Sequence, residues 1–89
     1  MNSREARVLL ADKLSEYRRL PYAALRERIG SVDTSTIVGP SGVQYQLEVQ
    51  FVWDSENVRI LGSIDDGGLR AFLPLCVSFG MAPDGKTVG

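Results

Sequence analysis

The chain has 89 residues, with ten Lys and Arg against eleven Asp and Glu, one cysteine and no histidine, which leaves a formal net charge of −1. Without histidine the chain cannot build an imidazole metal site or a Ser-His-Asp or Cys-His catalytic system, and one cysteine cannot form a disulfide within the chain. The length predicts one domain over residues 1–89 with one modest core, and the near-neutral charge argues against nucleic acid as a partner.

The first thirty residues have apolar side chains at helical spacing. Asn2 or Ser3 can cap the start of a long helix, and Asn2 with Glu5 three residues later fits a capping box. Pro21 ends this helix and suits the first position of a second, shorter one, and Gly30 stands where a left-handed residue closes it. The apolar stripe of the long helix consists of Ala6, Leu9, Leu10, Leu14 and Tyr17.

After the helices the apolar period changes from about 3.6 to 2 residues, which indicates β-strands. The alternation is clearest from Val43 to Trp53, and a hairpin turn at residues 39–42 joins this strand to an earlier one at 34–38. Further strands are expected at 58–64, 69–73, 77–79 and 86–88. The pattern predicts an α+β fold, in which two N-terminal helices pack on one face of a four- to five-stranded antiparallel meander sheet.

The C-terminal strands carry apolar side chains on both of their expected faces. These side chains are Leu61, Phe72, Leu73, Leu75 and Phe79. Because a two-layer fold covers only one face of its sheet, we expect either a strongly curled sheet or a partner surface over the surplus. Cys76 stands in the same apolar run with no basic neighbour, which predicts a buried and unreactive thiol.

An acidic turn supplies the candidate contact residues for a ligand or partner. Asp65 and Asp66 are followed by two glycines and then by Arg70. One interpretation is a carboxylate pair beside Arg70, which would hold a substrate anion in a shallow pocket near Trp53. The other, which turn chemistry favours, is a structural turn whose aspartate accepts local backbone hydrogen bonds. Phe72 joins these four residues as a candidate contact, since its side chain has no obvious place in the core.

Charge is unevenly divided along the chain. Residues 1–30 carry seven basic and four acidic side chains, a net of +3, whereas residues 31–89 carry three basic and seven acidic ones, a net of −4. A basic helical layer against an acidic sheet follows from this division. The favoured interpretation is that the two layers attract each other within the domain, and the alternative is a surface for an oppositely charged partner.

Short motifs lie in the second half of the chain, at residues 62–68 (GSIDDGG), 72–75 (F-x-PL), 78–79 (SF) and 81–85 (MAPDG). Others lie upstream, at residues 17–18 (YR), 20–22 (LPY), 39–42 (GPSG) and 45–46 (YQ). Together they resemble a group of small bacterial proteins of unknown function, and the resemblance extends over nearly the whole chain. It implies a bacterial, soluble, stand-alone domain. It brings no activity, cofactor or catalytic residue.

Neither a cofactor nor a metal is expected from the motifs. The turn at 39–42 lacks the lysine and the following helix of a phosphate loop, and the sequence offers no loop with calcium-ligand spacing. No apolar run is long enough to span a membrane, and the N-terminus does not have the pattern of a signal peptide. We therefore expect a bacterial cytoplasmic location, which also suits the single unpaired cysteine.

The leading functional hypothesis is a non-enzymatic protein- or peptide-interaction module, which can also associate with itself. It rests on the apolar surplus of the C-terminal strands and on the open edges of a meander sheet. The alternative is a small enzyme or small-ligand-binding protein that uses the turn region of Asp65, Asp66 and Arg70. Nucleic-acid binding by the basic helices is the weakest hypothesis, because acidic residues interrupt them.

Overall fold

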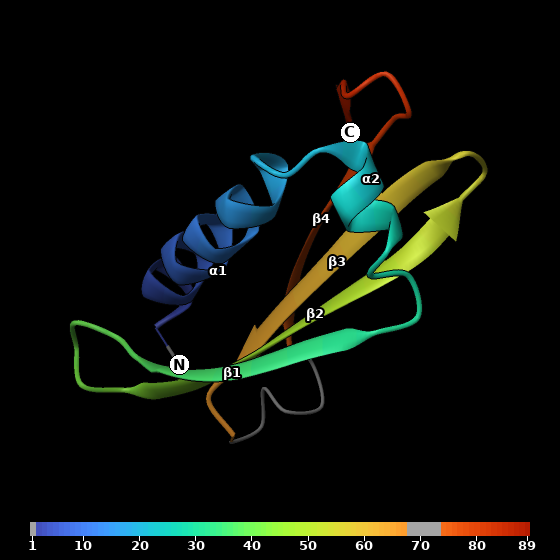
Figure 1. Cartoon of the computed structure of the whole chain (residues 1–89). Coiled ribbons are helices and arrows are strands. Elements are labelled where there is room, and N and C mark those ends of the chain that lie inside the picture. The colour runs from blue at the N-terminus through green and yellow to red at the C-terminus, as the bar shows by residue number, and fades with distance from the viewer. Residues whose placement is uncertain (1, 68–73) are drawn as a thin grey trace.

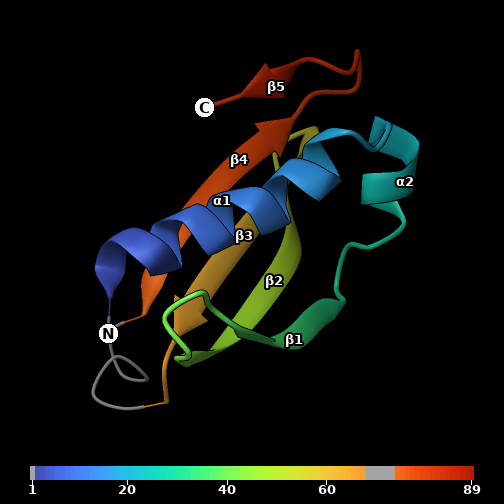
Figure 2. The same cartoon turned by 90° about the vertical axis from the view of Figure 1, so that its left-hand side faces the viewer.

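The computed structural model describes residues 2–67 and 74–89, which form a helical layer on one face of a single sheet (Figure 1, Figure 2). The elements are α1 (Ser3–Arg18), α2 (Tyr22–Arg26), β1 (Val32–Val38), β2 (Gln44–Asp54), β3 (Asn57–Asp65), β4 (Leu75–Met81) and β5 (Thr87–Val88). The strands follow one another across the sheet in chain order, and every pair is antiparallel. The predicted α+β fold is confirmed, whereas the strand expected at 69–73 lies outside the described residues.

The helical layer begins at the residue that the sequence indicates, whereas α1 ends at Arg18 and α2 ends at Arg26, both earlier than predicted. Asn2 caps α1, because its side-chain oxygen accepts the Glu5 amide at 3.1 Å. Pro21 precedes α2, and Gly30 has a φ of 87° where the chain leaves the helical layer. The buried face of α1 consists of Ala6, Leu10, Leu14 and Tyr17, with Leu9 packed at its margin.

β2 is an interior strand, between β1 and β3, and has the alternation of a half-buried strand. The side chains of Tyr45, Leu47, Val49 and Phe51 are buried beneath the helices, and the residues between them face outward and are exposed. The turn before β2 is closed by the Gly42 amide, which donates to the Gly39 carbonyl at 2.9 Å, and by Gly42 itself at a φ of 88°. This is a type I turn followed by a left-handed residue, a frequent three-residue hairpin loop.

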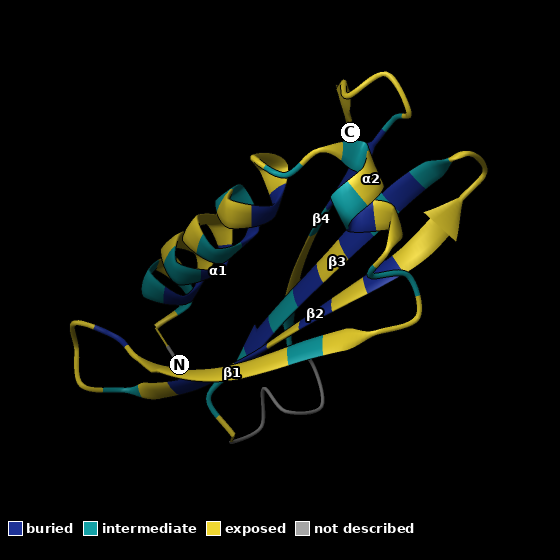
Figure 3. Cartoon of the chain, in the orientation of Figure 1, coloured by how far each residue is buried: buried dark blue, intermediate teal, exposed yellow. Residues whose placement is uncertain are grey.

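The position of α1 on the sheet depends on the one glycine within β3. α1 packs across β3 and β4, and α2 packs on β3. A Cβ atom at Gly62 would lie 3.0 Å from a methyl group of Leu10 and 3.0 Å from one of Leu14. Because glycine has no such atom, the helix approaches the sheet closely at this point. β1 lies beyond β2 at one edge of the sheet, and Figure 3 shows it exposed along most of its length.

Two predictions about the C-terminal strands are wrong. Phe79 is buried in the core rather than left over, because it lies opposite the buried Ile60 and therefore faces the helices. The guanidinium carbon of Arg18 lies 4.7 Å from the centre of its ring. Cys76 is exposed rather than buried, because it lies opposite Ser63 on the outer face of the sheet.

The remaining members of the apolar surplus divide between the two faces. Leu75 packs against the core, and Leu61 is 36% exposed on the outer face. Phe72 and Leu73 lie outside the described residues. Over residues 2–67 and 74–89, the outer face is less apolar than the sequence suggests, and most of its exposed side chains are polar.

Replacing Gly62 with alanine should destabilise the fold. The added methyl group would push against Leu10 and Leu14, and overpacking of this kind costs about 1–3 kcal/mol in the free energy of unfolding. Urea denaturation measures the change. The matched control is Ser63→Ala, on the opposite face of β3, which should alter the free energy of unfolding by less than about 0.5 kcal/mol. Equal unfolding midpoints for the two variants would contradict the close approach of α1.

Candidate functional site

The structure separates Trp53 from Asp65, two of the residues that the sequence groups into a candidate site. The Asp65 carboxylate accepts the Gly67 amide at 2.8 Å, which is the local hydrogen bond of a turn. Trp53 pairs with Val58 at the other end of β3, seven residues from Asp65, so about 23 Å of strand lies between them. Asp66 follows Asp65 at the end of β3. Arg70 and Phe72 lie outside the described residues.

Trp53 is half exposed, at 52%, near the end of β2. β2 extends past the start of β1, because Val32 of β1 pairs with Gln50. The indole therefore has no neighbouring β1 side chain beside it. It lies at the margin of the core, far from the acidic turn, and the two do not form a common pocket.

A different surface, which the sequence reasoning did not single out, lies along β1. The strand pairs with β2 on one side, and in the part of the chain that the structure describes no strand pairs with its other side. The Gly39 amide donates to the Val43 carbonyl at 2.8 Å, which makes these two residues a hydrogen-bonded pair. Since such pairs alternate along an antiparallel ladder, the backbone groups of residues 32, 34, 36 and 38 point away from β2.

The face of β1 toward the helices borders a groove of about 550 Å³, the helix-side groove, which lies between α1 and β1. Leu9, Ile37 and Leu47 supply its apolar lining. The charged side chains around it come from α1 and its C-cap residue and have both signs: Asp12, Lys13, Glu16 and Arg19. The groove exists because α1 packs on β3 and β4 and leaves the space above β1 uncovered.

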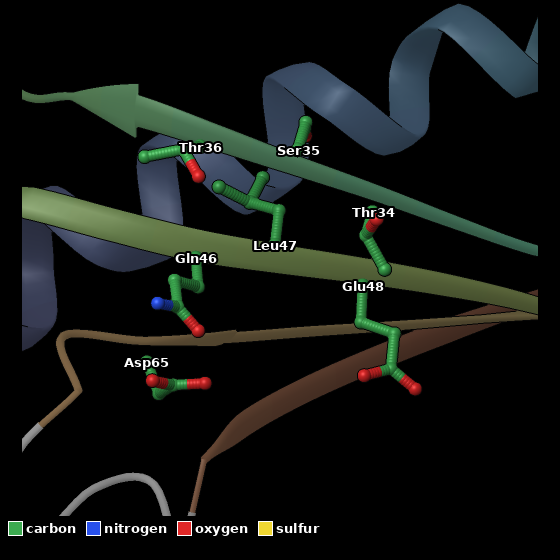
Figure 4. A pocket seen from close by; sticks show the side chains of 7 residues that line it. All are labelled: Thr34, Ser35, Thr36, Gln46, Leu47, Glu48 and Asp65. Atoms are coloured by element: carbon green, nitrogen blue, oxygen red, sulfur yellow. The ribbon is translucent and has the colours of Figure 1, made fainter.

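The opposite face of the same strand borders a second hollow of about 470 Å³, the outer depression. Figure 4 shows Glu48 and Thr34 on its side of the sheet, whereas Leu47 and Ser35 point toward the helices. Gln46 and Asp65 complete its polar lining. The two hollows share Ser35, Thr36 and Leu47. The open edge of β1 is therefore hollowed on both faces.

The hairpin end of β1 is fixed to the first turn of α1. The Glu5 carboxylate accepts the Ser41 hydroxyl at 2.7 Å, the Ser41 amide at 3.0 Å and the Tyr45 phenol at 2.9 Å. These bonds replace the return contact to Asn2 that a full capping box would make. Hydrogen bonds from Ser41 lower the pKa of the Glu5 carboxyl. A Cβ atom at Gly39 would overlap this carboxylate, which explains the glycine at the end of β1.

The other end of β1 is fixed through Asp33. Its carboxylate accepts the Tyr17 phenol at 2.7 Å, and an Arg28 nitrogen lies 3.7 Å away. Burial raises the pKa of the Tyr17 phenol, and the bond to Asp33 raises it further, so this phenol remains a donor. Tyr17 also packs edge-on against Phe51 at a centroid distance of 5.3 Å. β1 is thus held at both ends while its middle edge stays open.

Most charged side chains of the helical layer and of the sheet do not pair with each other. Arg28 with Asp33 joins the helical segment to the sheet. The other ion pairs between described residues, Lys13 with Glu16 and Arg59 with Asp54, lie within one layer. Acidic side chains on the outer face, such as Glu48, are separated from the helical arginines by the sheet itself. Electrostatic attraction between the helical layer and the sheet is therefore mainly the contact of Arg28 with Asp33, at one end of β1.

The chemistry of the β1 edge suits binding. Its groups are backbone amides and carbonyls, hydroxyls and a few apolar side chains, which supply hydrogen bonds and shape.

No three His, Cys, Asp or Glu side chains among residues 2–67 and 74–89 lie close enough to hold a metal ion. Neither described helix is long and apolar enough to cross a membrane. Comparisons with protein-family models, curated proteins and solved structures find no match to this chain.

The Glu5 contacts predict a pH-dependent stability difference. Because the pKa of Glu5 is lowered on folding, its ionised form stabilises the fold above the unfolded pKa, and this contribution is lost as pH falls through the folded pKa. Glu5→Gln should lower the urea midpoint at pH 7, and the difference from the parent chain should shrink toward about pH 2.5. Glu27→Gln, at an exposed position directly after α2, is the control. A difference that stays constant with pH would contradict the assignment.

Proposed function

We propose that this chain is a non-enzymatic protein-interaction module that binds an extended polypeptide segment along the open edge of β1. The observation that supports this most is the row of outward backbone groups at residues 32, 34, 36 and 38, with a hollow on either face. A strand added beside β1 would hydrogen-bond to that row. Because successive side chains of a strand point to opposite faces, they would enter the helix-side groove and the outer depression in turn.

The lining of the two hollows gives the bound segment a preferred composition. Leu9, Ile37 and Leu47 favour apolar side chains at the positions that face the helices. Glu48 and Asp65, together with hydroxyl groups, favour polar or basic side chains at the positions between them. A segment of alternating apolar and polar residues fits both requirements.

β1 also lacks the features that usually prevent pairing at an edge. Natural edge strands are commonly protected by proline, lysine or a bulge. The sequence Val32–Val38 contains neither proline nor lysine, and it pairs with β2 residue for residue. Its one charged side chain, Asp33, is held by Tyr17. At the opposite side of the sheet, β5 already covers the end of β4 at Gly80 and Met81.

The alternative of a small-ligand site in the acidic turn has less support, because the Asp65 carboxylate accepts a bond within the turn itself. The bacterial cytoplasmic location belongs to the proposal as well. It rests on the resemblance to small bacterial proteins and on the unpaired cysteine. An interaction module there would meet unfolded or extended segments of other proteins.

Selection from a displayed library of random peptides tests the edge directly. Peptides enriched on the parent chain should bind Thr36→Ala about equally well and Thr36→Pro at least about tenfold more weakly, because proline removes an outward amide that an added strand needs. Titration by fluorescence anisotropy measures the affinities. Since the Thr36 amide does not bond to β2, this proline should leave the β1–β2 ladder intact.

A second proline variant distinguishes a lost edge amide from a general loss of stability. Ser35→Pro removes an amide that bonds to β2, so it should lower the unfolding midpoint, whereas Thr36→Pro should change it little. Peptides that bind Thr36→Pro as tightly as the parent chain, or a selection that enriches none, would count against strand addition at β1.

A further inference from the structure

The sequence of the edge strand β1 is nearly symmetric about Ser35. Read from Ser35 in both directions, the sequence Val32–Val38 repeats itself: threonine stands at 34 and 36, and valine stands at 32 and 38. Only Asp33 and Ile37 break the pattern. A two-fold interface requires a surface that is complementary to itself. Antiparallel pairing of the strand with its own copy meets that condition for the backbone, and the symmetry of the sequence places like side chains opposite each other.

We propose that β1 pairs antiparallel with β1 of a second copy of this chain, about a two-fold axis at Ser35, so that the two five-stranded sheets become continuous. This inference rests on the proposed function and names the segment that occupies the edge. Thr34 then lies opposite Thr36 of the partner subunit, and Val32 lies opposite Val38 of the partner subunit. Each of these four positions has its backbone groups pointing outward, so every facing pair exchanges two hydrogen bonds.

Other registers satisfy fewer backbone groups. A shift by one residue would set outward-pointing groups against groups that already bond to β2. A shift by two residues keeps the pairing possible but leaves the last residues of each strand without a partner. The register centred on Ser35 is the one that uses the whole strand.

The side chains agree with this register. Val32 and Val38 are 51% and 64% exposed in the single chain, and pairing would place each against the other across the outer face. Threonine pairs form the centre of the same face, and cross-strand Thr–Thr contacts are favourable. On the helix face Asp33 would lie opposite Ile37 of the partner subunit. Its charge remains compensated by Tyr17 and Arg28 within its own chain.

The helical layer leaves room for the second copy. α1 lies over β3 and β4, away from the β1 edge where the two copies would meet, which we call the seam. Figure 2 shows β1 projecting beyond α1. The two-fold axis stands perpendicular to the sheet, so both helical layers occupy the same face. A seam of seven residues is smaller than a standard interface, and the dimer is accordingly weak and concentration-dependent.

Charge reversal at the seam tests the pairing. Thr34→Lys/Thr36→Lys and Thr34→Glu/Thr36→Glu should each weaken dimerisation at least about tenfold in sedimentation velocity, because like charges face each other across the two-fold axis. An equimolar mixture of the two variants should dimerise at least as well as the parent chain. Gln44→Lys/Gln50→Lys, which places the same charge on the outer face of β2, should leave dimerisation unchanged.

Disulfide trapping tests the register, in a Cys76→Ser background because Cys76 is exposed. Ser35→Cys should form a covalent dimer on mild oxidation, since a non-hydrogen-bonded pair brings the two Cα atoms to about 4.5 Å. Thr34→Cys should form no covalent dimer, because the same residue of the partner subunit lies diagonally, at about 7–8 Å. Equal trapping of both variants would overturn the proposed axis.

The results separate this inference from the proposed function. A parent chain that stays monomeric between roughly 10 and 500 μM overturns the dimer, and library peptides that require the Thr36 amide would still support strand addition at β1. A dimer that resists both charge-reversed variants also overturns the inference. If the dimer forms and the mixture rescues it, the β1 edge is identified as the seam.

Discussion

The rest of the structure depends on the close packing of α1 against β3. Gly62 lets Leu10 and Leu14 reach the sheet, and this contact places the one long helix over β3 and β4. A single helix is about 10 Å wide with its side chains and covers roughly two strands, which are spaced about 4.8 Å apart. β1 consequently extends beyond the cover, and the space between it and α1 becomes the helix-side groove.

An uncovered strand would ordinarily fray, and two contacts prevent this. Glu5 holds the hairpin at one end of β1, and Tyr17 holds Asp33 at the other. The strand between them keeps its extended conformation and its register with β2 before any partner arrives. Preorganisation of this kind reduces the entropy cost of binding, because only the incoming segment has to be ordered. The structure therefore combines an accessible edge with a rigid one.

Much of the fold could be predicted from the sequence, because its signals are local. The 3.6-residue stripe of α1, the alternation of β2 and the turn at Asp65 each depend on neighbouring residues, and each prediction agrees with the structure. The faces of β4 could not be predicted, because an apolar run from Leu75 to Phe79 does not show which side meets the helices. The sequence predicts that a meander sheet has open edges, but not which edge stays uncovered, because coverage by α1 is a tertiary property.

Amide hydrogen exchange, followed by NMR as a function of protein concentration, tests the central claim most directly. The amides of Ser35 and Ile37 bond to β2 and should be protected at every concentration. If the β1 edge pairs with a second copy, the amides of Thr34 and Thr36 should exchange rapidly in dilute solution and become protected as concentration rises. Exchange of these two amides that is independent of concentration, under conditions where the chain associates, would contradict it.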